Sequence, residues 1–205
     1  YVYYPPVTGA VNCGGSGIKI QQTGGLPGGS LFPLGVTTNT FELTNENGNT
    51  ATCSFDVYVW DGEAPVITML TDTIKPLWPP NHKMVPVYLN YNLSDNCGTA
   101  NSEIWIYSNE PENGTGDGDT SPDWQILDNH NILLRAERSA KGTGREYYIG
   151  IFAWDNSWNY SFRQLTVAVP HDMSRLKEYI VVPDKTGTTD LTEPMTVAVW
   201  PNPSR

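Results

Sequence analysis

Two segments of the chain share one pattern of apolar and polar positions. In 41–57 and again in 151–167, an alternating stretch runs into an Asn- or Asp-rich turn, and a second alternating stretch follows. Alternation with a period of two predicts half-buried strands, and Asn, Asp and Gly favour the backbone conformations of tight turns. We therefore expect two β-hairpins. Their separation of about 110 residues favours two copies of one kind of β module.

The rest of the chain follows the same period. No segment shows helical apolar spacing over more than about two turns, and 19 Gly and 16 Pro divide the chain into short pieces. We expect almost no helix. Further strands are expected at 18–20, 36–41, 53–60, 66–70, 85–89, 104–107, 132–136, 146–152 and 165–169, with one more at 195–200 in the tail.

Charge narrows the classes of partner. The 205 residues carry 22 acidic and 12 basic side chains, a net charge of −10, which repels phosphate backbones and argues against nucleic-acid binding. No apolar run approaches the roughly 20 residues that a membrane-spanning helix needs. We therefore expect neither nucleic-acid binding nor membrane insertion. An acidic surface of this kind tends instead to recruit divalent cations.

The three cysteines leave one without an obvious partner. Cys13 precedes the first hairpin and Cys53 follows its turn, so a disulfide between them would close a loop of about 40 residues and add on the order of 3 to 4 kcal/mol. The alternative is two reduced, buried thiols. We favour the disulfide because small modules in oxidising compartments commonly need such a staple. Cys97 is then a buried free thiol or the partner of a group outside the chain.

An acidic, Gly-rich loop at 109–124, called the acidic loop below, is the strongest candidate for a metal site. Oxygen ligands at alternate positions of a turn can converge on one hard cation, and calcium accepts such irregular geometry. The loop is not an EF-hand, because Pro122 stands where that loop needs glycine and strands flank it. The alternative is a solvated acidic loop held by Asx turns. The candidate ligands for Ca²⁺ are Glu110, Asp117, Asp119, Ser121, Asp123 and Asp128.

The chain shows no catalytic motif. It contains no Gly-x-Ser-x-Gly elbow, no phosphate-binding loop and no spacing that links its histidines as metal ligands. We therefore expect no enzyme activity and assign no catalytic residue. Trp78, Trp124 and Trp158 fall in loops or turns and could line a sugar-binding face, although large aromatics more often fill the cores of small sandwiches. The other tryptophans, Trp105 and Trp154 among them, lie in alternating strands where one face is core.

Residues 13–59 resemble the hyalin repeat, an immunoglobulin-like extracellular module. The resemblance rests on Leu26-Pro-Gly-Gly-Ser-Leu-Phe-Pro33 together with Asn47-Gly-Asn-Thr-Ala-Thr-Cys53-Ser-Phe. The family normally has further strands before the position of Tyr1. The resemblance therefore implies an open-fronted module, and a sheet with an open edge invites another strand to pair with it.

Residues 77–171 look like a bacterial immunoglobulin-like domain that occurs in tandem with hyalin repeats in secreted proteins. The motif Leu77-Trp-Pro-Pro-Asn-His-Lys-Met84 carries this resemblance. Val199-Trp-Pro-Asn-Pro-Ser204 resembles the opening of the C-terminal sorting signal of type IX secretion substrates in Bacteroidota. Asp72-Thr73-Ile74 resembles the O-glycosylation motif of the same group, with Thr73 as the acceptor.

Together these observations predict an all-β chain of two tandem immunoglobulin-like β-sandwiches with an extended C-terminal tail. The expected ranges are 1–62 for the hyalin-repeat-like sandwich, 63–172 for the second sandwich and 173–205 for the tail. The expected function is structural or adhesive, in a protein secreted to the cell surface. Its partners would be other copies, other surface proteins or glycans, and its tail could add a strand to another subunit to build a filament. The alternative is a carbohydrate-binding accessory module of a secreted hydrolase.

Overall fold

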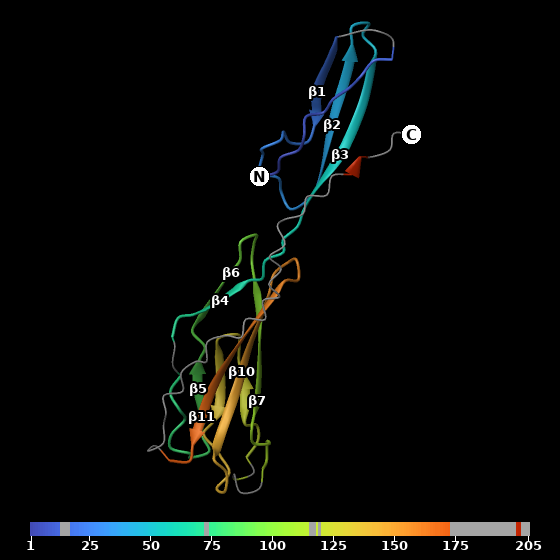
Figure 1. Ribbon diagram of the computed structural model, residues 1–205. Coiled ribbons are helices and arrows are strands. Elements are labelled where there is room, and N and C mark those ends of the chain that lie inside the picture. The colour runs from blue at the N-terminus through green and yellow to red at the C-terminus, as the bar shows by residue number, and fades with distance from the viewer. Residues whose placement is uncertain (13–16, 72–73, 115–117, 119, 173–199, 202–205) are drawn as a thin grey trace. The chain divides into compact units, whose positions relative to one another are not determined.

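The chain divides into two compact units, each described by itself below. A computed structural model describes residues 1–12, 17–71, 74–114, 118, 120–172 and 200–201 (Figure 1). The first unit is Tyr1–Asp61 with Leu191–Arg205, and the second unit is Gly62–Asp190. Among the described residues there is no helix, so none is available that is long and apolar enough to cross a membrane. The prediction of an all-β protein is confirmed.

The first unit is built on a four-stranded antiparallel sheet in the order β1-β2-β3-β12. Phe41 on β2 pairs in register with Gln22 on β1 and Cys53 on β3. The first predicted hairpin is therefore confirmed as β2 and β3. The strands are β1 (Ile18–Gly24), β2 (Gly35–Asn45), β3 (Thr50–Val59) and β12 (Trp200–Pro201).

The core of the first unit is small and depends on the start of the chain. Val2 is buried with Phe32 and Val57, and it is held by a β-bridge to Ser30. Tyr4 packs edge-on against Phe55, with ring centroids 4.9 Å apart, and its hydroxyl donates to the carbonyl of Leu26 at 2.8 Å. The N-terminal segment and the Pro- and Gly-rich segment 26–33 thus supply the apolar side chains that face the inner surface of β2 and β3.

The second unit is a β-sandwich of short sheets. One sheet has the strand order β11-β10-β7, another has the order β5-β9-β8, and β4 pairs with β6. All of these pairs are antiparallel. The strands are β4 (Val66–Met69), β5 (Met84–Tyr88), β6 (Tyr91–Ser94), β7 (Asn101–Ser108), β8 (Trp124–Ile126), β9 (Asn131–Arg135), β10 (Gly144–Trp154) and β11 (Tyr160–Pro170).

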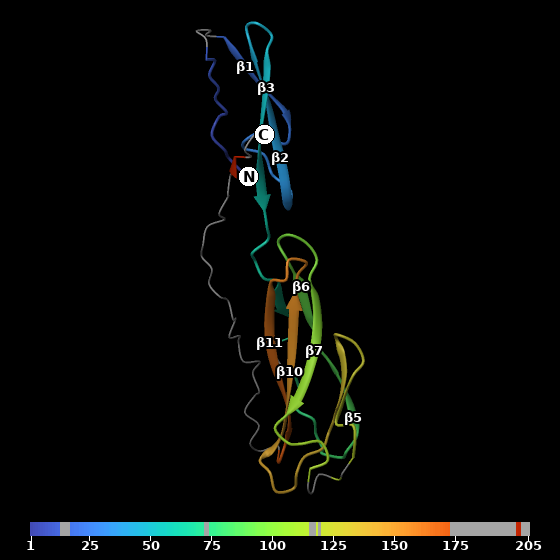
Figure 2. The ribbon, with the colours of Figure 1, turned by 90° about the vertical axis from the view of Figure 1, so that its right-hand side faces the viewer.

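The core of the second unit lies on one face of β7, β10 and β11, which run side by side in Figure 2. Every second residue of these strands points inward, as Ile149 and Ile151 do on β10, and both are fully buried. Across from them, Val87, Ile132 and Leu134 come from β5 and β9. The intervening residues of the three strands, such as Trp105 on β7, therefore face away from the core.

The second predicted hairpin is also confirmed, as β10 and β11, with Trp154 paired with Tyr160 at its closed end. The short strands β6 and β8 were not predicted from the sequence, since four and three residues are too few to establish a period. Of the predicted strand at 195–200, only Trp200 belongs to the described residues, and with Pro201 it pairs with β3.

Candidate functional site

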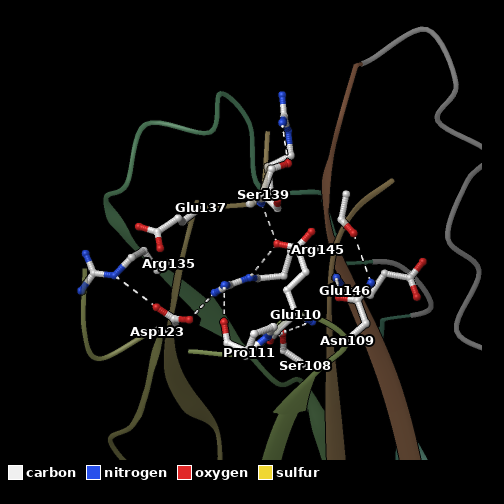
Figure 3. A network of polar contacts seen from close by, with 12 residues as sticks. Ser108, Asn109, Glu110, Pro111, Asp123, Arg135, Glu137, Ser139, Arg145 and Glu146 are labelled. Atoms are coloured by element: carbon white, nitrogen blue, oxygen red, sulfur yellow. Dashed lines mark hydrogen bonds and ion pairs between the residues drawn. The ribbon is translucent and has the colours of Figure 1, made fainter. Parts of the chain in front are cut away.

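The acidic loop leads to a buried ion-pair network around Arg145, on the inward face of β10 (Figure 3). Arg145 is fully buried, and its Nη1 donates both to Asp123 Oδ2 and, at 3.1 Å, to the hydroxyl of Tyr147. Its Nη2 donates to the carbonyl of Pro111 at 3.1 Å. Its Nε lies 3.5 Å from Glu110 Oε2. One guanidinium thus joins both ends of the loop to the core strand.

A second arginine completes the neutralisation of Asp123. Arg135 Nε lies 3.8 Å from Asp123 Oδ1, and the same guanidinium donates to the carbonyls of Pro122 and His82. Glu110 Oε2 also accepts the backbone N–H of Ser139 at 2.7 Å. Asp123 is completely buried, and a buried carboxylate is stable only when it is paired in this way.

This pairing corrects the expected roles of Asp123 and Glu110. Both were predicted as calcium ligands, but their oxygens face arginine and backbone N–H groups inside the second unit. The arginines lie 12 and 22 positions after Asp123, so no local sequence pattern announces the contact. Ser121 is exposed, while Asp117 and Asp119 lie outside the described residues. The calcium site stays a prediction, now for Asp117, Asp119 and Ser121.

Asp128 has a different role again, because it closes the turn between β8 and β9. Its Oδ1 accepts the backbone N–H groups of His130 at 2.8 Å and Asn131 at 2.7 Å, and the side-chain amide of Asn131 bonds both carboxylate oxygens. The bonds from the Asn131 side chain, and then those from the backbone, lower the pKa of Asp128. Asp128 is therefore an Asx-turn residue and is directed at its own hairpin rather than at Asp123.

Arg145 and Tyr147 both keep their protons near neutral pH. Burial alone would lower the pKa of Arg145, but the hydrogen bonds with Tyr147 and Asp123 outweigh it and raise the pKa above its usual value. Burial raises the pKa of Tyr147 to about 12, although the bond from Arg145 opposes the rise. Tyr147 therefore keeps its proton and donates it to the carbonyl of Arg135 at 2.8 Å. Neither group is suited to general acid–base chemistry, and we assign the network to holding the loop against β9 and β10.

The other predicted site residues do not come together. Cys53 is an exposed thiol on β3 with no disulfide partner among the described residues, and both Cys13 and Thr73 lie outside them, so the disulfide and the glycosylation stay predictions. Trp158 is 80% exposed in the β10–β11 turn and Trp78 is exposed in the Pro-rich loop. Trp124 is half-buried and packs edge-on against Tyr147, because the short strand β8 directs it into the core, which agrees with the alternative that such aromatics fill the sandwich.

A surface that the sequence analysis missed lies on the outer side of β7, β10 and β11. Their outward positions carry aromatic side chains, four of which are widely exposed: Trp105 at 63%, Tyr160 at 61%, Tyr107 at 51% and Phe162 at 46%. We call this surface the aromatic face. Its aromatic members are Trp105, Tyr107, Tyr148, Phe152, Trp154, Tyr160 and Phe162.

Several aromatic rings of this face lie against one another, both across neighbouring strands and along β10. The Tyr107 and Tyr148 ring centroids are 4.9 Å apart, and Phe152 lies between Trp154 at 5.8 Å and Tyr160 at 5.6 Å. The sequence held a signal for this face: in β10, Tyr148, Phe152 and Trp154 fall on one set of alternate positions while Ile149 and Ile151 fall on the other. Both sets carry large apolar side chains, so alternation alone could not say which one is covered.

The comparisons with known proteins concern the first unit. Residues 1–59 match the model of the HYR domain, an extracellular, adhesion-type module. The match supports the predicted hyalin repeat. The Leu77–Met84 motif and the C-terminal tail lie outside the matched residues, so their resemblances stay predictions. No curated protein matches the chain.

Proposed function

We propose that this chain is a non-catalytic structural and adhesive segment of a secreted cell-surface protein. The match of residues 1–59 to the HYR domain carries the proposal, because domains of this family occur in extracellular and cell-surface proteins. The second unit supports it as well, because the buried carboxylate of Asp123 is paired with two arginines and so has a structural role in the β-sandwich. Such a unit suits a spacer or a binding module.

We further propose that the first unit assembles by strand addition at β3. This strand lies beside β2 on one side, and on the other side Trp200 and Pro201 pair with Asp56 and Phe55 only. Among the described residues, the part of this edge from Thr50 to Ser54 has no neighbouring strand. An open strand edge is a template for another chain, so a tail from a second copy could pair along it and produce a filament.

The test is to remove the tail from the full chain. Deletion of residues 186–205 should abolish concentration-dependent polymers, measured by light scattering after size-exclusion chromatography and by electron microscopy. A synthetic peptide of residues 195–205 should bind the truncated chain, and the scrambled peptide should not. The thermal transition of the second unit should be unchanged by the deletion. Polymers that persist without the tail would contradict strand addition, although the adhesive role of the modules would stand.

A further inference from the structure

We propose that the aromatic face of the second unit is a docking surface for a neutral polysaccharide chain. This inference rests on the proposed adhesive function and names a ligand class and a place for it. The residues concerned differ from Trp78, Trp124 and Trp158, the candidates that the sequence suggested. The fold of the second unit does not need the aromatic face.

The other side of the same sheet already supplies the core. Ile104, Ile149, Ile151, Leu165 and Val167 are buried there. The solvent-facing side of an antiparallel sheet is normally polar, so a row of aromatic side chains on it costs solubility and contributes little to the core. A contiguous exposed apolar surface of this kind marks a site of interaction.

The centre of the aromatic face is shaped by Gly150. In register, Gly150 of β10 lies between Trp105 of β7 and Gln164 of β11. A Cβ placed on Gly150 would come within 2.8 Å of the Phe162 ring, so this ring leans over the glycine. Any side chain at position 150 would displace it. Along β10 the outward positions from Tyr148 to Trp154 span about 20 Å, long enough for several sugar rings.

Polar groups are placed among the aromatic rings. Tyr107 donates its hydroxyl proton to Gln164 Oε1 at 3.0 Å, and Tyr148 donates to Glu146 Oε2 at 2.7 Å. Asn101 and Glu103 lie at outward positions on β7. A sugar chain offers C–H faces and hydroxyl groups. Aromatic rings stack on the C–H faces of a pyranose, and neighbouring amide and carboxylate groups hydrogen-bond its hydroxyls, so the aromatic face carries both kinds of partner.

Charge selects a neutral ligand. The outward positions of β7, β10 and β11 are all described, and they carry Glu103 and Glu146 but neither lysine nor arginine; Arg145 and Arg163 occupy inward positions. The only charged side chains that an anionic polysaccharide or a phosphate would meet at these positions are the carboxylates of Glu103 and Glu146, which repel it. A second copy of the chain would bring its own net charge of −10 and the same carboxylates, which disfavours self-association through this face.

The experiment is affinity electrophoresis of the full chain in native gels that contain one neutral polysaccharide each, namely a soluble β-glucan, xylan, mannan or starch, with a gel containing polygalacturonate as the anionic comparison. We expect retardation in at least one neutral gel and none with polygalacturonate. Trp105→Ala should weaken that binding at least tenfold, and Gly150→Val should do the same by displacing the Phe162 ring. Trp158→Ala is the matched control, an exposed tryptophan outside the aromatic face, and should bind like the parent chain. Each variant should keep the parent's near-ultraviolet circular dichroism above 270 nm, except for the contribution of the indole that the two Trp→Ala variants lose.

The outcomes separate this inference from the proposed function. No retardation in any neutral gel, or equal loss of binding in Trp158→Ala and Trp105→Ala, would overturn the polysaccharide assignment. The light-scattering and electron-microscopy assay for polymers is run on Trp105→Ala as well, and we expect this variant to form normal polymers. Loss of polymers in this variant together with absent sugar binding would identify the aromatic face as a contact between copies and would also overturn the assignment.

Discussion

The β2–β3 and β10–β11 turns are built with the same hydrogen bonds from different residues. In the first, Asn45 Oδ1 accepts the N–H groups of Asn47 at 3.0 Å and Asn49 at 2.9 Å. In the second, Asp155 Oδ1 accepts those of Ser157 at 2.8 Å and Asn159 at 2.9 Å. In both turns the residue before the last has a left-handed backbone, Gly48 with φ 80° and Trp158 with φ 66°.

The two turns differ in burial and in the left-handed residue. Asp155 is only 3% exposed and receives a further bond from the Asn159 side chain at 2.8 Å, whereas Asn45 is half-buried. Glycine adopts a left-handed conformation at no steric cost, but tryptophan does not. The side-chain cap therefore defines this turn, and the left-handed position tolerates a strained residue once the cap is in place.

The largest expected effect comes from removing the buried cap. Asp155→Ala should lower the free energy of unfolding of the second unit by about 2 to 3 kcal/mol, because the N–H groups of Ser157 and Asn159 lose their acceptor. Asn45→Ala should cost the first unit about 1 kcal/mol, since water can reach its turn more easily. Both are measured by denaturant titration, with hydrogen exchange of each hairpin to assign the transition.

Asp155→Asn is the matched control for the cap. It keeps one side-chain oxygen as the acceptor and should therefore lose clearly less stability than Asp155→Ala. Equal losses in the two Asp155 variants, or equal losses from Asp155→Ala and Asn45→Ala, would show that burial of the cap does not set its contribution.

A smaller effect of opposite sign is expected at the left-handed position. Trp158→Gly should stabilise the second unit by about 0.5 to 1 kcal/mol, because it relieves the strain of a positive φ and gives up little packing from a side chain that is 80% exposed. Gly48→Ala in the first turn should destabilise by about 1 kcal/mol for the same reason. Thermal unfolding of both variants checks the pair. A destabilised Trp158→Gly would mean that the indole makes contacts that outweigh the strain.

The smallest expected effect concerns the β8–β9 turn, which has the same kind of cap in Asp128. Bonds from the Asn131 side chain and from the His130 and Asn131 N–H groups lower its folded pKa below the unfolded value, so this turn is stabilised above the unfolded pKa and loses that stability as pH falls through the folded pKa. The Asn45 turn has no such dependence, because an amide does not titrate. A carboxyl NMR titration should show Asp128 titrating below a model aspartate. An unshifted Asp128, or an Asn45 hairpin that opens over the same pH range, would contradict the difference.

Local features of the sequence were sufficient to predict both hairpins. Their strands have period-two patterns and their turns are short, so the residues that decide the structure are neighbours in the chain. The ion pairs of Asp123 were beyond such reasoning, because Arg145 approaches it only when β10 packs next to the loop. The sequence left open whether Trp124 is exposed or packed for a similar reason, since a three-residue strand shows too few positions to reveal an inward side.

The all-β class, the twin hairpins and their Asn and Asp caps follow from the sequence alone, because each depends on interactions within a few residues. Which apolar set of β7, β10 and β11 is covered depends instead on how the sheets pack. Both sets contain large apolar side chains, and the covered set is the one that faces the opposing sheet of β5, β8 and β9, on the side of Ile149 and Ile151. The aromatic side chains of Trp105, Tyr160 and Phe162 are therefore left on the surface.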